Sequence, residues 1–374
     1  MTAPLVKGWC PGALRPMMSG DGMVVRVRPF GGRLSRAQAD AIASLAAAHG
    51  NGMLDLSSRA NIQIRGVQEA SHAPLIEGLR GMGLIDATPQ IEGRRNIIVT
   101  PFWQPEDEAE GLVAALSDAL AADDAPDLPV KFGFAVDTGA APVLQSASAD
   151  IRIERDAGGG LIVVADGMDK GIAVTSRTAV QTAIDVAHWF IGHAQGATRM
   201  AAVVGQGTLP ETAVVPRQSG SYQPEPDVTP QGALVGVAFG QMQARTLAAL
   251  AKHGALRLTP WRLVLVENAR DLPVIDGVIT QTDDPLLRIT ACTGAPACAQ
   301  AEGETRSLAR TLAPHLRTGH TLHVSGCAKG CAHPRAAPLT ITAQPDGYAL
   351  VKQGRAGDTP AYTALSSDDL KGHV

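Results

Sequence analysis

Four of the five cysteines form two close pairs near the C-terminal end of the chain. Five residues separate Cys292 from Cys298, and three separate Cys327 from Cys331. Two pairs of thiolates on two loops suit either a zinc ion or an iron-sulfur cluster. Structural zinc sites usually place about two to four residues within a pair, so the longer first gap and the Gly, Ala and Pro content of both loops favour the cluster. The fifth cysteine, Cys10, stands alone, and we interpret it as an incidental thiol.

Cations gather near the start of the chain, in a protein whose net charge is -4. Residues 1–36 contain six lysines and arginines against the single acid Asp21. Such an asymmetry requires a partner with negative charge, and guanidinium groups pair well with carboxylates. We therefore expect a basic wall that binds a ligand with several carboxylates, although each cation taken singly is equally consistent with a solvated surface. The candidate residues are Arg26, Arg28, Arg59, Arg65, Arg94, Arg95 and Lys131.

The elements that must position these groups occur twice. Residues 30–66 and 239–266 both read as a helix, a glycine break, a strand with alternating apolar residues, a polar turn and a second strand. Each copy then continues with a strand, a helix, another strand and a hairpin. The hairpin of the first copy is predicted to pair residues 151–155 with 161–165, and the helix of the second copy is predicted over residues 302–316. The cysteine pairs lie in the second copy and the candidate cations in the first, with a proline-rich linker between the copies. The duplication predicts one cofactor site between two related halves.

Length and composition place the chain among globular proteins with more than one packing unit. It has 374 residues, of which 45% are hydrophobic and 18% charged. The acidic net charge argues against a nucleic-acid partner, and no apolar stretch reaches the roughly 20 residues that a membrane helix needs. No signal-peptide core follows Met1, so we expect a cytoplasmic protein with no membrane partner.

The spacing C-x5-C followed by C-x3-C, inside a duplicated chain, resembles the sirohaem-dependent nitrite and sulfite reductase family over nearly the whole length. In that family four cysteines hold a 4Fe-4S cluster and the last also bridges to the sirohaem iron. The resemblance therefore implies that Cys292, Cys298, Cys327 and Cys331 are cluster ligands. Further segments are similar to the precorrin-3B synthase branch: Arg15-Pro16-Met17-Met18-Ser19-Gly20-Asp21-Gly22, Ser58-Arg59-Ala60-Asn61 and His323-Val324-Ser325-Gly326-Cys327-Ala328-Lys329-Gly330-Cys331-Ala332-His333-Pro334.

The resemblance also implies an activity. Members of the branch are monooxygenase-type oxidoreductases that use O2 to hydroxylate precorrin-3A and form a lactone in aerobic cobalamin biosynthesis. By the same resemblance, Arg59, Arg95 and Lys131 are the expected catalytic residues, because their counterparts reach the anionic substrate or the sirohaem. Sirohaem or non-haem iron is a further candidate cofactor beside the 4Fe-4S cluster, with His333 as a candidate iron ligand.

NADH is the indirect electron source that the resemblance implies. No glycine motif for a dinucleotide lies between a strand and a helix, so we expect a separate reductase or ferredoxin to deliver the electrons. The other expected partners are the tetrapyrrole substrate and O2.

One departure from the reductase pattern bears on the choice between branches. The reductases carry a second lysine two residues after the first, whereas here the residue two positions after Lys131 is Gly133. We interpret the lost cation as weakening the case for sulfite or nitrite reduction, and the glycine as leaving room for a larger substrate. His320 and His323 are interpreted as hydrogen-bonded structural residues. The remaining alternatives are a sirohaem-dependent nitrite or sulfite reductase, and a non-catalytic protein that binds a metal cluster or zinc.

The predicted fold class is α+β, an internally duplicated nitrite/sulfite reductase-like fold with pseudo-twofold symmetry. It combines two ferredoxin-like units with a mixed α/β cofactor domain made of two halves. The expected boundaries are 20–90 for the first ferredoxin-like unit, 91–215 for the cofactor-domain half with the basic wall, 216–231 for the linker, 232–284 for the second ferredoxin-like unit and 285–355 for the half with the cysteines.

Overall fold

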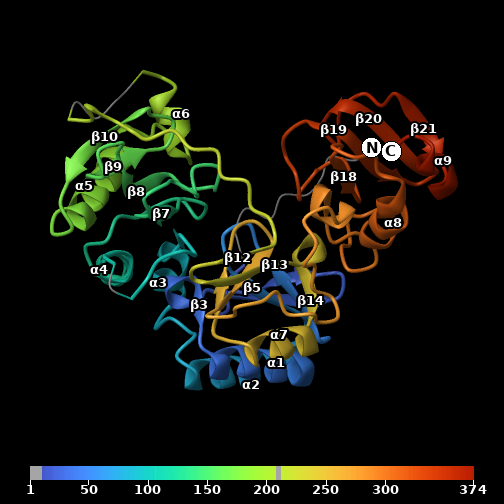
Figure 1. Ribbon diagram of the computed structural model, residues 1–374, viewed down its shortest axis with the longest axis horizontal. Coiled ribbons are helices and arrows are strands. Elements are labelled where there is room, and N and C mark those ends of the chain that lie inside the picture. Colours follow the sequence, from blue (N-terminus) through green and yellow to red (C-terminus); the bar gives the residue numbers. More distant parts are fainter. Residues whose placement is uncertain (1–10, 106, 208–211) are drawn as a thin grey trace.

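The computed structural model describes residues 11–105, 107–207 and 212–374. A lower body supports two lobes that stand to either side of it (Figure 1). Within the described residues the strands form four separate sheets, combined with helices in every part, which confirms the predicted α+β class. No described helix is both long enough and apolar enough to span a membrane.

Two sheets make up the lower body, in the strand orders β1-β2-β5-β4-β14 and β12-β13-β16-β15-β3. Their pairings are antiparallel. The strands from the first copy are β1 (Met17–Ser19), β2 (Gly22–Val27), β3 (Arg33–Leu34), β4 (Met53–Leu56) and β5 (Ile62–Val67). Those from the second are β12 (Asp227–Thr229), β13 (Gly232–Gly236), β14 (Gln241–Gln243), β15 (Leu256–Leu258) and β16 (Leu263–Glu267).

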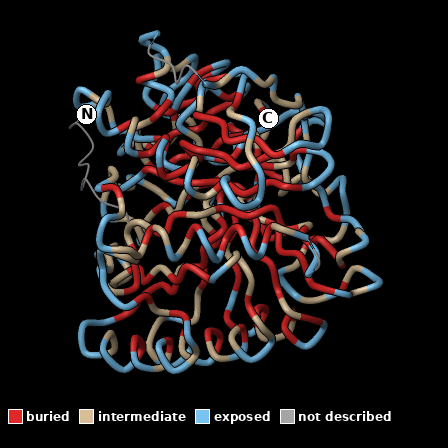
Figure 2. Tube along the Cα trace, turned by 90° about the vertical axis from the view of Figure 1, so that its left-hand side faces the viewer, coloured by how far each residue is buried: buried red, intermediate tan, exposed pale blue. Residues whose placement is uncertain are grey.

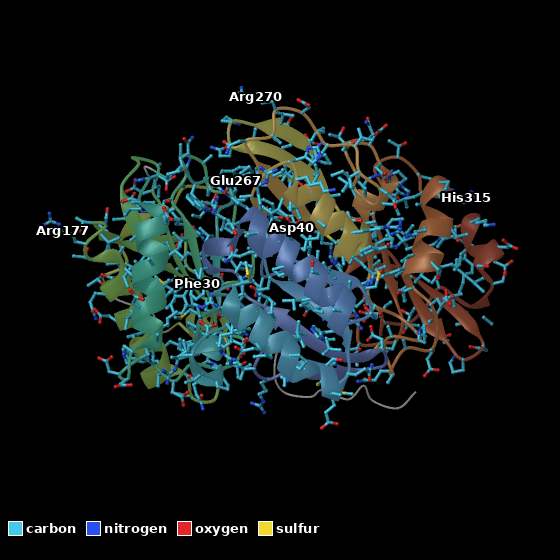
Figure 3. All side chains as sticks on the ribbon, turned by 90° about the horizontal axis from the view of Figure 1, so that it is seen from below. Phe30, Asp40, Arg177, Glu267, Arg270 and His315 are labelled. Atoms are coloured by element: carbon cyan, nitrogen blue, oxygen red, sulfur yellow. The ribbon has the colours of Figure 1, made fainter. Side chains whose placement is uncertain are left out.

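Each of these sheets takes its last strand from the other copy. β14 pairs with β4, with Met242 opposite Leu54, and β3 pairs with β15, with Leu34 opposite Leu256. The exchange is reciprocal, as twofold pseudosymmetry requires, and it joins the two ferredoxin-like units into one body. Their helices α1 (Arg36–His49) and α7 (Ala244–Ala251) pack side by side below the sheets, next to α2 (Glu69–Gly81) (Figures 1 and 3).

Local sequence explains where α1 begins and which face it buries. Ser35 accepts a hydrogen bond from the Gln38 backbone N–H, while the Gln38 side chain accepts one from the Ser35 N–H, which makes a capping box. Small and apolar side chains then recur at helical spacing and are buried, whereas Asp40 is exposed on the outer face (Figure 3). Figure 2 shows the buried segments concentrated in the strands above these helices. The buried residues of α1 are Ala39, Ile42, Ala43 and Ala46.

The two lobes repeat one topology of three parallel strands followed by antiparallel ones. The first lobe has β6 (Ile97–Val99), β7 (Phe134–Asp137), β8 (Ile151–Arg155), β9 (Leu161–Ala165), β10 (Lys170–Val174) and β11 (Val215–Pro216). The second has β17 (Ile289–Ala291), β18 (Leu322–Ser325), β19 (Ala337–Gln344), β20 (Gly347–Gly354) and β21 (Tyr362–Leu365). The helices of the lobes are α3 (Pro89–Arg94), α4 (Ala109–Ala121), α5 (Ala179–His193), α6 (Met200–Val204), α8 (Arg306–Leu312) and α9 (Ser367–Lys371).

Strand register fixes which residues of the two copies correspond. In the lobes, β6 pairs with β7 as β17 pairs with β18, so Ala135 corresponds to His323. The next hydrogen bond along is also repeated: the Thr100 N–H donates to the Val136 carbonyl, and the Cys292 N–H donates to the Val324 carbonyl. In the lower body the turns after β4 and β15 each place a residue at positive φ four positions past the strand, Ala60 in one copy and Arg262 in the other.

The predicted hairpin of β8 and β9 is confirmed at both ends, but the helix predicted over residues 302–316 is shorter. The first predicted residues are not helical, because the Gly303 carbonyl and the Thr305 hydroxyl form hydrogen bonds with the first cysteine loop. Near its other end Pro314 lacks an N–H, and the chain tightens there into a 3-10 turn, Ala313–His315.

Candidate active site

The four cysteines lie beyond the carboxyl ends of two neighbouring parallel strands. Cys292 follows β17 directly and Cys327 comes two residues after β18, so the parallel pairing brings both loops to one edge of the sheet. The Gly326 N–H donates a hydrogen bond to the Cys292 Sγ at 3.2 Å, which links the two loops through a sulfur. The structure thus brings together the two pairs that the sequence analysis singled out.

Small residues allow the loops to approach this closely. Gly294 has a φ of +71°, and a Cβ on it would lie 2.5 Å from the Thr305 hydroxyl oxygen. A Cβ on Gly326 would lie 2.7 Å from the Cβ of Ala301. Partial burial raises the pKa of the Cys331 thiol; Lys329 opposes this, and the sulfurs of the other three cysteines add to it. All four thiols therefore lie within electrostatic reach of one another.

The sulfurs are not gathered around a single point. Across residues 11–105, 107–207 and 212–374, no three His, Cys, Asp or Glu side chains lie close enough together to hold one metal ion. Cys331 is the most exposed of the four cysteines, and Cys292, Cys298 and Cys327 are more buried than it is.

The first cysteine loop docks on the sheet of the other copy through one carbonyl. The Ala297 oxygen, next to Cys298, accepts hydrogen bonds from the Ser19 hydroxyl at 2.6 Å and from the Gly20 N–H at 2.9 Å. A third donor is the Arg65 guanidinium, at 3.3 Å. The position of Cys298 therefore depends on residues of the first ferredoxin-like unit.

Arg65 belongs to a buried ion-pair network. Its side chain is 6% exposed and pairs with Asp21 at 2.6 Å and Asp55 at 3.2 Å. Asp55 also pairs with Arg306, the first residue of α8, at 3.0 Å. Burial opposes the charge of Arg65, but the hydrogen bond to Asp21 and the two carboxylates outweigh it, so the pKa of Arg65 is raised. In this structure Arg65 connects the two copies, and its fork is occupied by carboxylates of the chain itself.

The second copy repeats this network with the charges inverted. Arg257 and Glu267 occupy the positions of Asp55 and Arg65 in the strand register, and they pair at 2.6 Å. Arg257 also donates to the Pro101 carbonyl of the first lobe at 2.8 Å. Each sheet of the body thus holds the lobe of the opposite copy through a buried charged residue.

Arg28 and Arg95 of the predicted basic wall are buried and hydrogen-bonded within the first copy. Arg95 forms a two-pronged pair with Asp86 at 2.7 and 2.8 Å, and it lies 3.8 Å from the centre of the Phe30 ring. Arg28 donates to the Glu92 carbonyl at 2.6 Å. Arg95 therefore supports the wall from behind its surface, while Arg28 is held by the backbone at the edge of the wall.

The more accessible part of the wall contains Arg26, Arg59, Arg94 and Lys131. Lys131 is exposed, and its carbonyl accepts a hydrogen bond from Arg59 at 2.7 Å, so these two predicted residues lie side by side. Arg26 binds the Gln63 side chain at 2.8 Å, and Arg94 is the last residue of α3, a helix that the sequence analysis did not predict.

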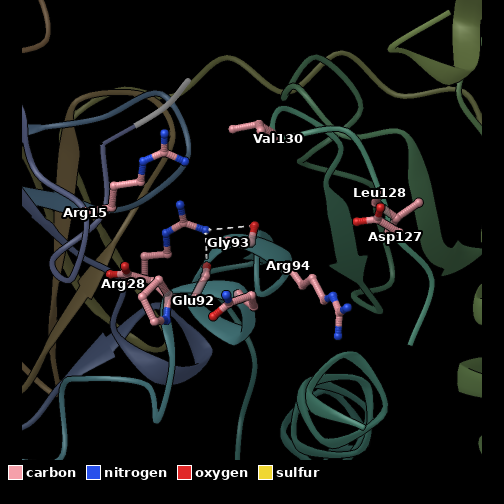
Figure 4. Close-up of a pocket in the computed structure, with 11 residues that line it drawn as sticks. Arg15, Arg28, Glu92, Gly93, Arg94, Asp127, Leu128 and Val130 are labelled. Atoms are coloured by element: carbon pink, nitrogen blue, oxygen red, sulfur yellow. Dashed lines mark hydrogen bonds between the residues drawn. The ribbon is translucent and has the colours of Figure 1, made fainter. Parts of the chain in front are cut away.

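A cavity of about 320 Å³ opens beside this wall, between the lower body and the first lobe (Figure 4). Arg15, Arg28 and Arg94 line it, together with the backbone of Gly12. Glu92 fixes its rim, because its carboxylate accepts hydrogen bonds from the Ala13 and Leu14 backbone N–H groups. Arg15 was counted among the N-terminal cations, and the structure places it with two of the predicted wall residues.

The structure corrects the interpretation of Gly133. A Cβ there would lie 2.8 Å from the Asn96 side-chain nitrogen and 3.1 Å from its carbonyl oxygen. The Gly133 N–H donates to buried Asp150 at 3.0 Å, and its carbonyl accepts from the Asp150 N–H at 2.7 Å. The expectation that this glycine leaves room for substrate is wrong; it permits close packing of the strand start against Asn96.

The interpretation of His323 as a hydrogen-bonded residue is also wrong. The ring is 1% exposed, and neither nitrogen has a hydrogen-bond partner among the described residues. Its ring lies 5.6 Å from that of His333, which follows the second cysteine pair. Burial, aided by the charges of His333 and Arg262, lowers the pKa of His323 to about 4. His320 is exposed, and Cys10 lies outside the described residues.

Sequence analysis also missed Arg262, which contacts the second cysteine loop. Its guanidinium donates to the Thr290 hydroxyl at 3.1 Å and to the Ala332 carbonyl at 3.4 Å. Burial lowers the pKa of Arg262 to about 10, with Arg306 acting in the same direction. An alignment of the two internal copies would have revealed it, since the corresponding turn of the first copy carries Ala60.

The comparisons with known proteins agree with this arrangement. A family model described as the nitrite/sulfite reductase ferredoxin-like half domain matches residues 15–82. A precorrin-3B synthase from Sinorhizobium sp. is 30% identical over 431 aligned positions, which cover 96% of this chain and 86% of that protein. The chain belongs to the precorrin-3B synthase family.

The structural comparison confirms the fold of this family member. The NirA protein of Mycobacterium tuberculosis superposes with a TM-score of 0.62 at 18% identity, over 94% of this chain and 79% of that one. The predicted duplicated nitrite/sulfite reductase-like fold is therefore correct. Family membership and fold together make the chain an enzyme of the oxidoreductase class.

Proposed function

We propose that the protein is a precorrin-3B synthase that uses O2 to hydroxylate precorrin-3A and form its lactone in aerobic cobalamin biosynthesis. The observation that carries the proposal is the pair of cysteine loops at one sheet edge, linked through the Cys292 sulfur and docked on the basic first copy. The named Sinorhizobium relative supports the substrate.

The four cysteines fit a 4Fe-4S cluster. Each thiolate of such a cluster binds a different iron, so four sulfurs that are near one another without surrounding one point suit it better than they suit zinc. The backbone N–H on the Cys292 sulfur, at 3.2 Å, is a contact that stabilises a thiolate. Cys292, Cys298, Cys327 and Cys331 would hold the cluster, which supplies electrons one at a time when bound.

The first copy binds and orients the substrate in this proposal. Lys131 and Arg59 are adjacent and accessible, and we assign to them the carboxylate side chains of the tetrapyrrole. The cavity lined by Arg15 and Arg94 would take a further carboxylate. Arg95 supports the wall from behind, and Arg28 is held at its edge. Fixing the ring through several ion pairs would keep the hydroxylated carbon and the lactone-forming carboxylate together.

The redox balance requires an external donor. Hydroxylation places one oxygen atom of O2 in the substrate and the other in water, which consumes two electrons and two protons. We propose that NADH provides these electrons through a separate reductase or ferredoxin, and that sirohaem or non-haem iron would be a further group that supplies oxygen-activating chemistry when bound.

Anaerobic purification followed by iron and sulfide analysis and by an absorption spectrum tests the cofactor. Oxygen uptake with precorrin-3A and an artificial reductant then tests the reaction. We expect four irons and four sulfides per chain from the cluster and a fifth iron from the further group, O2 consumption that depends on precorrin-3A, and no useful reduction of sulfite or nitrite. Sulfite or nitrite turnover without precorrin-dependent O2 uptake would instead identify a sirohaem reductase. Absence of both iron and sulfide from anaerobically reconstituted protein would overturn the cluster assignment.

The substrate wall has a test of its own. We expect Arg59→Ala to weaken tetrapyrrole binding in a fluorescence titration, while Arg36→Ala leaves it unchanged. Arg36 is the matched control, because its side chain binds the Ala251 carbonyl at the end of α7. Equal affinities of the two variants would refute the assignment of Arg59 to the wall.

A further inference from the structure

The buried imidazole of His323 points to a missing partner. A polar group left without a hydrogen bond in the protein interior destabilises the fold, because it has lost its water without gaining a partner. Both nitrogens of His323 are in this state among the described residues, in a ring that is 1% exposed. The adjacent loop is the one that joins Cys327 to Cys331, since a Cβ on Gly330 would lie 3.6 Å from the Cε1 of His323.

Arg262 brings a desolvated positive charge to the same place. Among the described residues its hydrogen bonds go to two uncharged oxygens, those of Thr290 and Ala332, and Thr290 is the strand neighbour of His323. The carboxylate that acts on the charge of Arg262 is that of Asp55, which is already shared by Arg65 and Arg306. Among the described residues, Arg262 therefore has no carboxylate to itself.

The internal duplication provides a natural comparison for both residues. The first copy has no cysteine cage, and its loop after β6 begins with Thr100 where the second copy has Cys292. At the two positions that correspond to Arg262 and His323, the first copy has Ala60 and Ala135. The arginine and the histidine thus occur only in the copy with the cysteines, in an otherwise repeated backbone.

We propose that Arg262 and His323 are positioning residues that stabilise the negative charge of the iron-sulfur group held by the four cysteines and thereby raise its reduction potential. The proposal rests on the cluster assignment made above. Four thiolates give such a cluster a net negative charge, which each added electron increases. The potential of a cluster depends on nearby charge, hydrogen bonding and solvent exposure, and a cation in a poorly solvated region acts strongly over short distances.

The two residues make different contributions. Arg262 supplies a full charge, and its hydrogen bond to the Ala332 carbonyl fixes the chain next to Cys331. His323 supplies one N–H donor, because burial keeps the ring neutral. We therefore expect the arginine to have the larger effect on the potential.

The experiment uses the full-length, reconstituted protein and introduces the residues of the first copy, as Arg262→Ala and His323→Ala. Iron and sulfide content is measured first, and the reduction potential is then obtained from an EPR-monitored redox titration. His320→Ala and Arg245→Ala are the controls, since both side chains are exposed in the same copy. Arg262→Lys keeps the charge and serves if the alanine variant does not fold.

We expect full iron content and a lower potential in the two alanine variants. For Arg262→Ala the reduced-to-oxidised ratio at a given applied potential should fall at least tenfold, which is about 59 mV for one electron. His323→Ala should show a smaller fall, and Arg262→Lys should lie between the wild type and Arg262→Ala.

Unchanged potentials and EPR spectra in variants that keep their iron would overturn the inference and leave the cluster assignment intact; that result would mean that a buried water satisfies His323. A wild-type protein that holds neither iron nor sulfide would instead remove the cluster assignment, and the inference with it.

Discussion

Replacing Arg65 by methionine should be one of the most damaging single changes outside the cysteines. The substitution keeps an unbranched side chain of similar length but removes a guanidinium that is 6% exposed and pairs with two carboxylates. Breaking a buried pair from one side typically costs about 3–5 kcal/mol. Both carboxylates keep a partner in the variant, because Asp55 still pairs with Arg306 at 3.0 Å and Asp21 still accepts a hydrogen bond from Asn51 at 3.2 Å. We therefore expect the free energy of unfolding to fall by about 3 kcal/mol, the lower end of that range.

Urea unfolding of the apo-protein measures this loss of free energy, with Arg80→Met as the control. Arg80 pairs with Glu77 at 2.7 Å, but the two side chains are 53% and 77% exposed, and such pairs contribute about 0–1 kcal/mol. Since Arg65 also binds the carbonyl next to Cys298, Arg65→Met should retain iron less well than Arg80→Met. A loss below about 1 kcal/mol for Arg65→Met, or equal iron retention, would refute the role of this network.

Three further outcomes are expected. Cys298→Ser should lose its iron and sulfide, because a hydroxyl is a poor ligand for the cluster, and colorimetric analysis of the purified variant checks this. Gly133→Ala should lower the free energy of unfolding by about 1–3 kcal/mol through its clash with Asn96, whereas Gly139→Ala, whose Cβ would lie 3.5 Å from its nearest neighbour, should not. Burial raises the pKa of Asp137 to about 6, although hydrogen bonds from the Leu144 and Val143 N–H groups act in the opposite direction. The folded state therefore binds a proton on Asp137 more tightly than the unfolded chain does. Stability should therefore fall as the pH rises from about 4 to 6, by up to about 3 kcal/mol, and Asp137→Asn should flatten that slope in urea titrations.

Much of the cysteine site and of the duplicated architecture follows from local sequence. Thiol chemistry and spacing are enough to predict, without a structure, that Cys292, Cys298, Cys327 and Cys331 bind one metal group, because ligand type and loop length restrict which group can bind. The glycine-rich turn at residues 156–160 marked the ends of the β8–β9 hairpin correctly, because glycine permits the tight turn that joins two antiparallel strands. The capping residues of α1 similarly fix where that helix begins.

The three-dimensional fold decided which cations stay accessible and which pair with carboxylates of the chain itself. Arg65 and Arg95 look in sequence like Arg59 and Lys131, yet they pair with carboxylates that lie 44 and 9 residues away along the chain. Charge pattern alone cannot reveal such partners, because the pairing depends on which strands become neighbours. The exchange of β3 and β14 between the two sheets was invisible for the same reason.

Gly133 and His323 show the limit most clearly. From the sequence, Gly133 could be interpreted as leaving open space for a ligand. Only the packed structure shows that Asn96 fills the space next to Gly133. A histidine in a strand is usually hydrogen-bonded, and only the burial of His323 beside Gly330 and Arg262 shows that its nitrogens are unpaired among the described residues. Residue type and spacing thus determined which chemistry is available to this chain, whereas the distances between residues remote in sequence determined which groups are free to perform it.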